Sequence, residues 1–132
     1  MASCESPAIP GREGEAVIRI KRVYDAPSSA DGARVLVDRL WPRGVSKERA
    51  AVRLWMKEVA PSTELREEFH HDPGRWEEFR RRYRAELAGK QDLVRTLKEK
   101  AGQGTLTLVY SSREQHINNA VALKMFLEEE AG

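Results

Sequence analysis

An apolar stretch of the chain, residues 35–37, runs directly into charged and aromatic side chains. The residues that follow include Asp38, Arg39, Trp41 and Arg43. Arginine carries a planar guanidinium group that binds a phosphate or a carboxylate through two parallel hydrogen bonds. A stretch that is apolar without alternation is typical of a strand covered on both faces of a parallel sheet. The sequence therefore predicts an anion site where this strand ends.

Two other predicted strands end in side chains of the same kinds. These are Arg22 and Tyr24 after the first strand, and Ser111, Ser112 and Arg113 after the last. In open α/β sheets the carboxyl ends of parallel strands share one edge, where ligands bind. We expect the side chains of all three segments to meet there, with the N–H groups at the start of the following helix adding donors for the anion. The preferred function is therefore a pocket for a small phosphorylated or nucleotide-like ligand.

Asp38 and Glu114 are the candidates for acid–base catalysis at this edge. A carboxylate that lies among arginines is a good electrostatic anchor but a poor general base at neutral pH. Binding is therefore better supported than turnover, and whether the protein is an enzyme stays open.

The same residues also have a structural interpretation. Arg39 and Arg43 could pair with carboxylates and so lock the turn; the carboxylates within reach are Asp38 and Glu48. Trp41 could cap the core, and the serines could do no more than cap a helix. Binding is favoured because helix caps and ion pairs do not require three separate segments to converge on one edge.

A helix predicted to begin near Pro73 is rich in arginine, which suggests nucleic-acid binding. Its basic residues are Arg75, Arg80, Arg81, Arg82 and Arg84. Two glutamates, at residues 77 and 78, precede two of these arginines by four residues, a spacing that favours ion pairs on a helix. We therefore expect a solvated face there. A nucleic-acid or protein binding module that uses the basic sheet edge remains the alternative function.

Other chemistries lack their sequence signals. His70 and His71 are adjacent, which does not place two metal ligands on one helix face, and no cysteine pair supports zinc. The chain has no glycine-rich phosphate loop and no Gly-x-Ser-x-Gly turn. We expect neither a metal nor a cofactor.

The composition predicts a single domain. A chain of 132 residues with 40% hydrophobic residues can form one core but not two domains of ordinary size. We assign the domain to residues 16–130 and a flexible tail to residues 1–15. The chain has no segment approaching the roughly 18 apolar residues of a membrane helix, and the tail does not resemble a signal peptide. A lone cysteine, Cys4, favours the reducing cytoplasm, and no membrane partner is expected.

Residue periodicity and helix caps predict the order of the elements. Strands are expected over residues 17–23, 34–38, 52–57 and 105–110, the first and third at sheet edges. Helices are expected after Ser62, from Pro73 to Gly89, up to Gly102, and after a cap at Ser111 or Ser112. Such alternation implies a small three-layer α/β domain, with a mostly parallel sheet of three or four strands and helices on both faces.

Several stretches also carry a resemblance to a known family. They read KRVYD at residues 21–25, DGARVLVDRLWPRGVSKE at 31–48, APSTELR at 60–66, FRRRYRAEL at 79–87 and TLVY at 107–110. In this order they resemble the YeaO-like family of bacterial domains of unknown function, over about residues 17–128. The family has no established activity, so the resemblance implies membership and no particular reaction.

One segment departs from the family pattern. After the last strand, family members resemble Tyr-Ala-Ala-Lys-Asp followed by His-Asn-His-Ala, whereas residues 110–120 read YSSREQHINNA. Asn118 keeps its place and joins the predicted ligand-binding residues. Glu114, Ile117 and Asn119 differ, and the family's histidines are lost or replaced by His116. The departure indicates either lost function or changed specificity.

Overall fold

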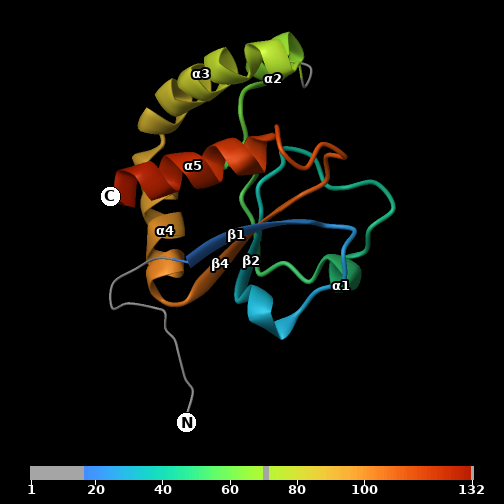
Figure 1. Cartoon of the computed structure of the whole chain (residues 1–132). Coiled ribbons are helices and arrows are strands. Elements are labelled where there is room, and N and C mark those ends of the chain that lie inside the picture. Colours follow the sequence, from blue (N-terminus) through green and yellow to red (C-terminus); the bar gives the residue numbers. More distant parts are fainter. Residues whose placement is uncertain (1–16, 70–71, 132) are drawn as a thin grey trace.

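A sheet of four parallel strands forms the centre of the computed structural model, which describes residues 17–69 and 72–131 (Figure 1). The strands are β1 Val17–Arg22, β2 Ala33–Leu36, β3 Leu54–Trp55 and β4 Thr105–Tyr110. Their order is β1-β4-β2-β3, so the two predicted edge strands are confirmed. All four residues of β2 are buried, which explains why this part of the sequence does not alternate.

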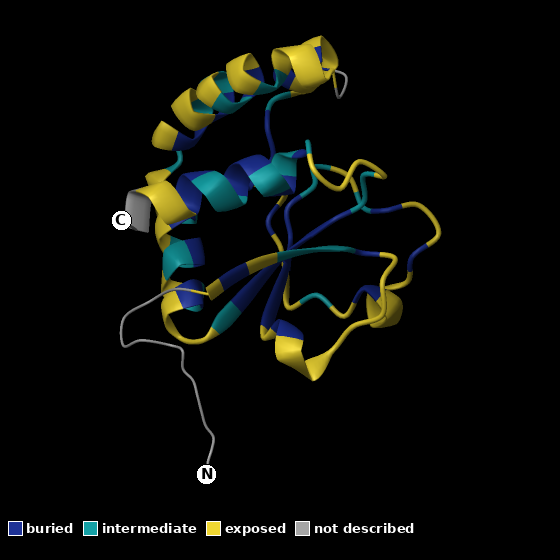
Figure 2. Ribbon diagram, viewed as in Figure 1, coloured by how far each residue is buried: buried dark blue, intermediate teal, exposed yellow. Residues whose placement is uncertain are grey.

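Helices follow β2, β3 and β4; those after β3 and β4 were predicted from the sequence, whereas the short one between β2 and β3 was not. They are α1 Lys47–Ala50, α2 Thr63–Phe69, α3 Trp76–Ala88, α4 Gln91–Gly102 and α5 Asn119–Ala131. Helices α4 and α5 pack against β1 and β4, and α3 lies over α5 on the side away from the sheet (Figure 1). The sheet-facing sides of α4 and α5 are buried, whereas α2 and α3 expose their outer sides (Figure 2). The predicted α/β class is confirmed.

The two faces of the sheet carry cores of different size. The large core lies under α4 and α5 and contains Leu106, Leu108 and Leu123. The opposite face is covered by α1 and by the loops around it. A smaller core lies there, made of Val23, Leu36, Val45, Ala50 and Val109. Alternate residues of β4 point to opposite faces, so one short strand serves both cores.

The last helix begins later than the sequence predicted. We expected a cap at Ser111 or Ser112, but α5 starts at Asn119. Asn118 is the residue that caps it, since its Oδ1 accepts a hydrogen bond from the Val121 N–H at 2.9 Å. Ser111 is held instead by Asp38, which accepts hydrogen bonds from its N–H and its hydroxyl. Residues 111–118 therefore form a loop.

A buried ion pair, which the sequence gave no reason to single out, lies on the α1 face of the sheet. Arg34 Nη1 lies 2.7 Å from Asp31 Oδ2, and Asp31 is fully buried. Lys21 Nζ lies 3.1 Å from the same oxygen. Arg34 Nη2 also donates to the Ala50 carbonyl at 2.7 Å, so the pair attaches α1 to the sheet.

Parts of the chain lie outside the described residues. The tail expected over residues 1–15 belongs to them, and so do His70 and His71.

Candidate anion-binding site

A cleft of about 400 Å³ opens where the strands end at the carboxyl edge of the sheet. Its volume lies within the range of small-molecule sites. The segments that follow β1, β2 and β4 supply its walls, together with residues from 60 to 66 and the first residue of α5. The lining residues are Tyr24, Asp38, Arg39, Leu40, Trp41, Pro42, Arg43, Ala60, Pro61, Arg66, Ser111, Ser112 and Asn119.

Most of the predicted site residues line this cleft. They are Tyr24, Asp38, Arg39, Trp41, Arg43, Ser111 and Ser112. The remaining four do not line it: they are Arg22, Arg113, Glu114 and Asn118. Parallel strands account for this result, because β2 and β4 are neighbours and end at the same edge.

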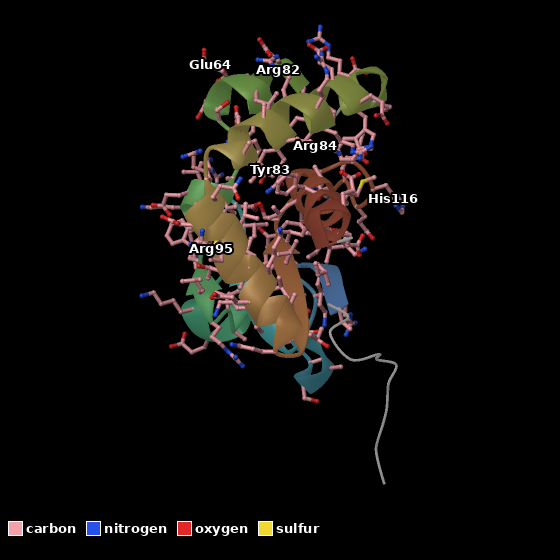
Figure 3. All side chains as sticks on the ribbon, turned by 90° about the vertical axis from the view of Figure 1, so that its left-hand side faces the viewer. Glu64, Arg82, Tyr83, Arg84, Arg95 and His116 are labelled. Atoms are coloured by element: carbon pink, nitrogen blue, oxygen red, sulfur yellow. The ribbon has the colours of Figure 1, made fainter. Side chains whose placement is uncertain are left out.

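The four residues outside the cleft have other places in the structure. Arg22 lies behind the cleft wall, where its Nε donates to the Ser112 carbonyl at 2.9 Å. Its guanidinium also lies 5.0 Å from the centre of the Tyr24 ring. Arg113 and Glu114 are exposed on the loop, and buried Asn118 caps α5. His116 is exposed on the same loop and projects outward (Figure 3).

The Asp38 carboxylate is held by hydrogen-bond donors rather than by arginine. Its Oδ2 accepts from the Ser111 N–H at 2.9 Å and from the Ser111 hydroxyl at 2.7 Å. Its Oδ1 accepts from Asn119 Nδ2 at 3.1 Å, and the same amide group donates to the Val37 carbonyl at 3.0 Å. Asp38 thus fixes the end of β2 against the loop and against the first residue of α5.

The arginines of the cleft are not neutralised by carboxylates. Across residues 17–69 and 72–131, none of Arg39, Arg43 and Arg66 forms an ion pair. Arg39 Nη2 donates to the Ala60 and Pro61 carbonyls, each at 3.3 Å, and its buried Nε has no partner. The interpretation that Arg39 and Arg43 form ion pairs with nearby carboxylates is therefore wrong for the described residues. Three arginines beside one carboxylate give the cleft a positive potential.

Aromatic side chains hold the turn that carries two of these arginines. Trp41 Nε1 donates to the Val45 carbonyl at 2.7 Å, and Trp55 Nε1 donates to the Asp38 carbonyl at 2.8 Å. The two indoles meet edge to face, with ring centres 5.4 Å apart. The Tyr24 hydroxyl donates to the Arg43 carbonyl at 3.2 Å. The turn is thus fixed through its backbone, which leaves the guanidinium of Arg43 exposed.

Side chains from α3 and the turn after it support the opposite wall, the segment that leads into α2. Glu86 accepts hydrogen bonds from the Ser62 N–H at 2.9 Å and the Ser62 hydroxyl at 2.6 Å. Ser62 Oγ also accepts from the Leu65 N–H, which confirms Ser62 as the cap of α2. Tyr83 points inward from α3, whereas the neighbouring Arg82 points outward (Figure 3). The Tyr83 hydroxyl donates to the Val59 carbonyl at 2.5 Å, and burial raises its pKa.

Lys90 supports the same wall. Its Nζ donates to the Glu58 carbonyl at 2.6 Å and to the Ala60 carbonyl at 3.2 Å. Desolvation lowers the pKa of Lys90, nearby Glu86 opposes that change, and the positive charge of Arg39 adds to it. Arg39 and Lys90 both donate to the Ala60 carbonyl. The cleft wall is therefore attached both to the segment after β2 and to the turn after α3.

The model of the inactive DUF488-N3 subclade matches residues 17–132 of this chain. The chain belongs to this DUF488 family. The YeaO-like resemblance found in the sequence is thereby confirmed.

Relatives of this DUF488 protein are of similar length. YeaO of Escherichia coli (strain K12), an uncharacterized protein, is 44% identical over 110 residues, which cover 83% of this chain and 96% of YeaO. The uncharacterized proteins Mb3100c of Mycobacterium bovis and Rv3073c of Mycobacterium tuberculosis are each 42% identical over 113 residues. Those matches cover 86% of this chain and 95% of each relative. No solved structure matches the chain.

Two polar cleft residues of the DUF488 domain, Arg66 and Asn119, were not among the predicted site residues. Arg66 lies four residues after the α2 cap, a position that the predicted helix already contained, but the orientation of α2 relative to the sheet was unknown. Asn119 was noted only as a departure from the family pattern. It is the first residue of α5 and lies against Asp38.

The described part of this DUF488 chain lacks two features. There, no group of three His, Cys, Asp or Glu side chains could hold a metal ion. Nor does that part contain a helix with the length and apolarity needed to cross a membrane.

Proposed function

We propose that the cleft binds a small phosphorylated or nucleotide-like anion without converting it. The observation that carries the proposal is the set of three arginines, Arg39, Arg43 and Arg66, which line one cleft and have no carboxylate partner among the described residues. An arginine in a concave site can place two parallel N–H groups on a phosphate. Tyr24 and Trp41 line the same cleft and offer ring surface to a larger ligand.

Binding without turnover follows from the state of the carboxylates. A general base must reach the proton that it removes. Asp38 is occupied by Ser111 and Asn119, and Glu114 does not line the cleft. The description of the matching subclade as inactive supports the same proposal.

A nucleic-acid or protein binding module at the same basic edge is the second candidate. The arginines of α3 give it little support, since several of them already contact glutamates. Arg80 lies 3.4 Å from Glu77 and 3.1 Å from Glu129. Arg82 contacts Glu68, and Arg84 contacts Glu129. A nucleic acid would therefore have to use the cleft edge itself.

The two candidates are separated by thermal stabilisation of the purified protein. The ligands are inorganic phosphate, sulfate, nucleoside monophosphates, and short DNA and RNA, each at low and moderate salt. A ligand at one hundred times its Kd stabilises the folded state by about 2.7 kcal/mol, which is readily seen in Tm. We expect small anions to raise Tm in the native protein.

Two matched variants locate the effect. Arg43→Ala removes an exposed guanidinium but keeps the backbone carbonyl that Tyr24 contacts, so the fold should persist. This change should weaken anion binding about tenfold or more. Arg81→Gln on the exposed side of α3 should leave it unchanged. A Tm shift with oligonucleotides alone, falling steeply with salt, would instead support the nucleic-acid module.

A further inference from the structure

A second, smaller cleft of about 230 Å³ adjoins the first. Its lining residues are Pro61, Thr63, Arg66, Glu67, Phe69, Phe79 and Asn119. Pro61, Arg66 and Asn119 also line the larger cleft, so the two clefts lie side by side and share a wall. Arg66 lies between the two clefts. A ligand with its anionic group in the first cleft would reach the second by passing the Arg66 side chain.

One face of α2 supplies three of the polar residues of this second cleft, and Asn119 of α5 supplies a fourth. Thr63, Arg66 and Glu67 have the spacing that places three residues on one side of a helix. Glu67 makes no hydrogen bond or ion pair within the described residues. Its carboxylate is exposed, and with its two oxygens it can accept hydrogen bonds from two adjacent donors.

Apart from Asn119, the remaining lining of the second cleft is apolar. Phe69 and Phe79 are almost fully buried, with their rings stacked and ring centres 4.3 Å apart. Pro61 lies at the boundary between the two clefts and is also buried. The small part of these residues that stays exposed forms an apolar floor, which suits the uncharged face of a ring, and the carboxylate at the rim suits the donor edge of that ring.

We propose that the ligand is a purine nucleoside monophosphate, with guanine favoured over adenine. This inference rests on the proposed function, because its phosphate lies among the arginines of the first cleft. The base lies in the second cleft, where guanine presents N1–H and its amino group side by side to the Glu67 carboxylate. Adenine presents one amino group beside an unprotonated ring nitrogen, and that nitrogen would face the carboxylate unfavourably.

The test measures the Kd of four ligands by calorimetry: inorganic phosphate, ribose 5-phosphate, AMP and GMP. The variant is Glu67→Gln, which keeps the size of the side chain but replaces one acceptor with a donor. Its control is Glu64→Gln, also on α2, because Glu64 points outward and does not line the cleft (Figure 3). Both substitutions lie on an exposed helix surface, so both variants should fold.

We expect GMP to bind at least about tenfold more tightly than ribose 5-phosphate or AMP. Two hydrogen bonds from guanine to the Glu67 carboxylate account for a difference of this size. Glu67→Gln should remove that advantage without changing the Kd of ribose 5-phosphate, and Glu64→Gln should change neither Kd.

Each contrary result has its own meaning. If ribose 5-phosphate binds through Arg43 but the base adds nothing, or GMP binds equally well to Glu67→Gln, the purine inference is wrong and the anion site stands. Preference for AMP would overturn the assignment of guanine. If neither phosphate nor any phosphorylated ligand binds, the proposed function and this inference both fail.

Discussion

Asp38 and Ser111 are joined by two hydrogen bonds, although 73 residues separate them in the sequence. One carboxylate oxygen, Oδ2, accepts both the backbone N–H and the hydroxyl of Ser111. The contact joins a residue just beyond the end of β2 to the residue that follows β4. It also determines the shape of the cleft, since both residues belong to its lining. Asp38 is therefore a positioning residue in this account.

Removal of the Asp38 carboxylate should destabilise the domain. Asp38→Ala leaves the N–H of Ser111 without its acceptor and leaves Asn119 Nδ2 with the Val37 carbonyl alone, at a cost of about 1 to 3 kcal/mol. Ser111→Ala loses one hydroxyl contact and should cost about 1 kcal/mol. The free energy of unfolding in urea measures both.

A double-mutant cycle isolates the contact between them. Because the two residues are bonded to one another, the double variant should lose clearly less stability than the two single losses combined. Strict additivity would show that the contact contributes nothing in solution.

Asn118 should behave as the cap of the last helix. Asn118→Ala removes the acceptor for the Val121 N–H and should lower the free energy of unfolding by about 1 to 2 kcal/mol. Asn118→Ser offers a hydroxyl in the same place and should recover part of the loss. Urea denaturation of the native protein and of the two variants measures these differences. An alanine variant as stable as the native protein would show that Asn118 does not cap α5.

Much of the sheet was predictable from local patterns. The alternation at residues 17–21 and the unbroken apolar stretch at residues 35–37 distinguish an edge strand from a central one. The sheet of the structure agrees, with β1 at an edge and β2 buried. The convergence of three segments on one cleft followed from the same reasoning, because it needed only parallel strands.

What could not be predicted depends on contacts between distant residues. Serine is a good helix cap, so the pattern after β4 favoured Ser111 or Ser112. In the structure Ser111 is bound to Asp38, and the helix begins eight residues further along the chain. Arg66 lines the cleft because contacts from Glu86 and Tyr83 fix the position of the segment that leads into α2. Neither arrangement has a local sequence signal.

The buried pair of Asp31 and Arg34 should make stability depend on acid. Burial opposes ionisation of Asp31, but hydrogen bonds from Ser28, Lys21 and Arg34 outweigh it and hold its pKa below the ordinary value of 3.8. A carboxyl with a lowered folded pKa stabilises the protein above its unfolded pKa. That stabilisation should begin to disappear below about pH 4 and should be lost as the pH falls through the folded pKa.

Asp31→Asn tests this dependence. At neutral pH the variant should lose about 3 to 5 kcal/mol, because Arg34 is left as an unpaired buried charge. It should also show a weaker loss of stability than the native protein between about pH 4 and pH 2. Urea denaturation across this range measures both effects. The exposed Asp25→Asn variant is the control, and a native-like acid profile in Asp31→Asn would contradict the assignment.

The central claim is that a small anion binds in the cleft at the carboxyl edge of the sheet, and its location is the most direct test. A two-dimensional amide NMR titration of the ¹⁵N-labelled protein with inorganic phosphate reports which residues sense the ligand. The account predicts shifts at residues 38–41, 43–44, 66, 111–112 and 119, saturating with added phosphate and lost in Arg43→Ala. Shifts confined to α3, or no saturable shift at the cleft residues, would contradict it.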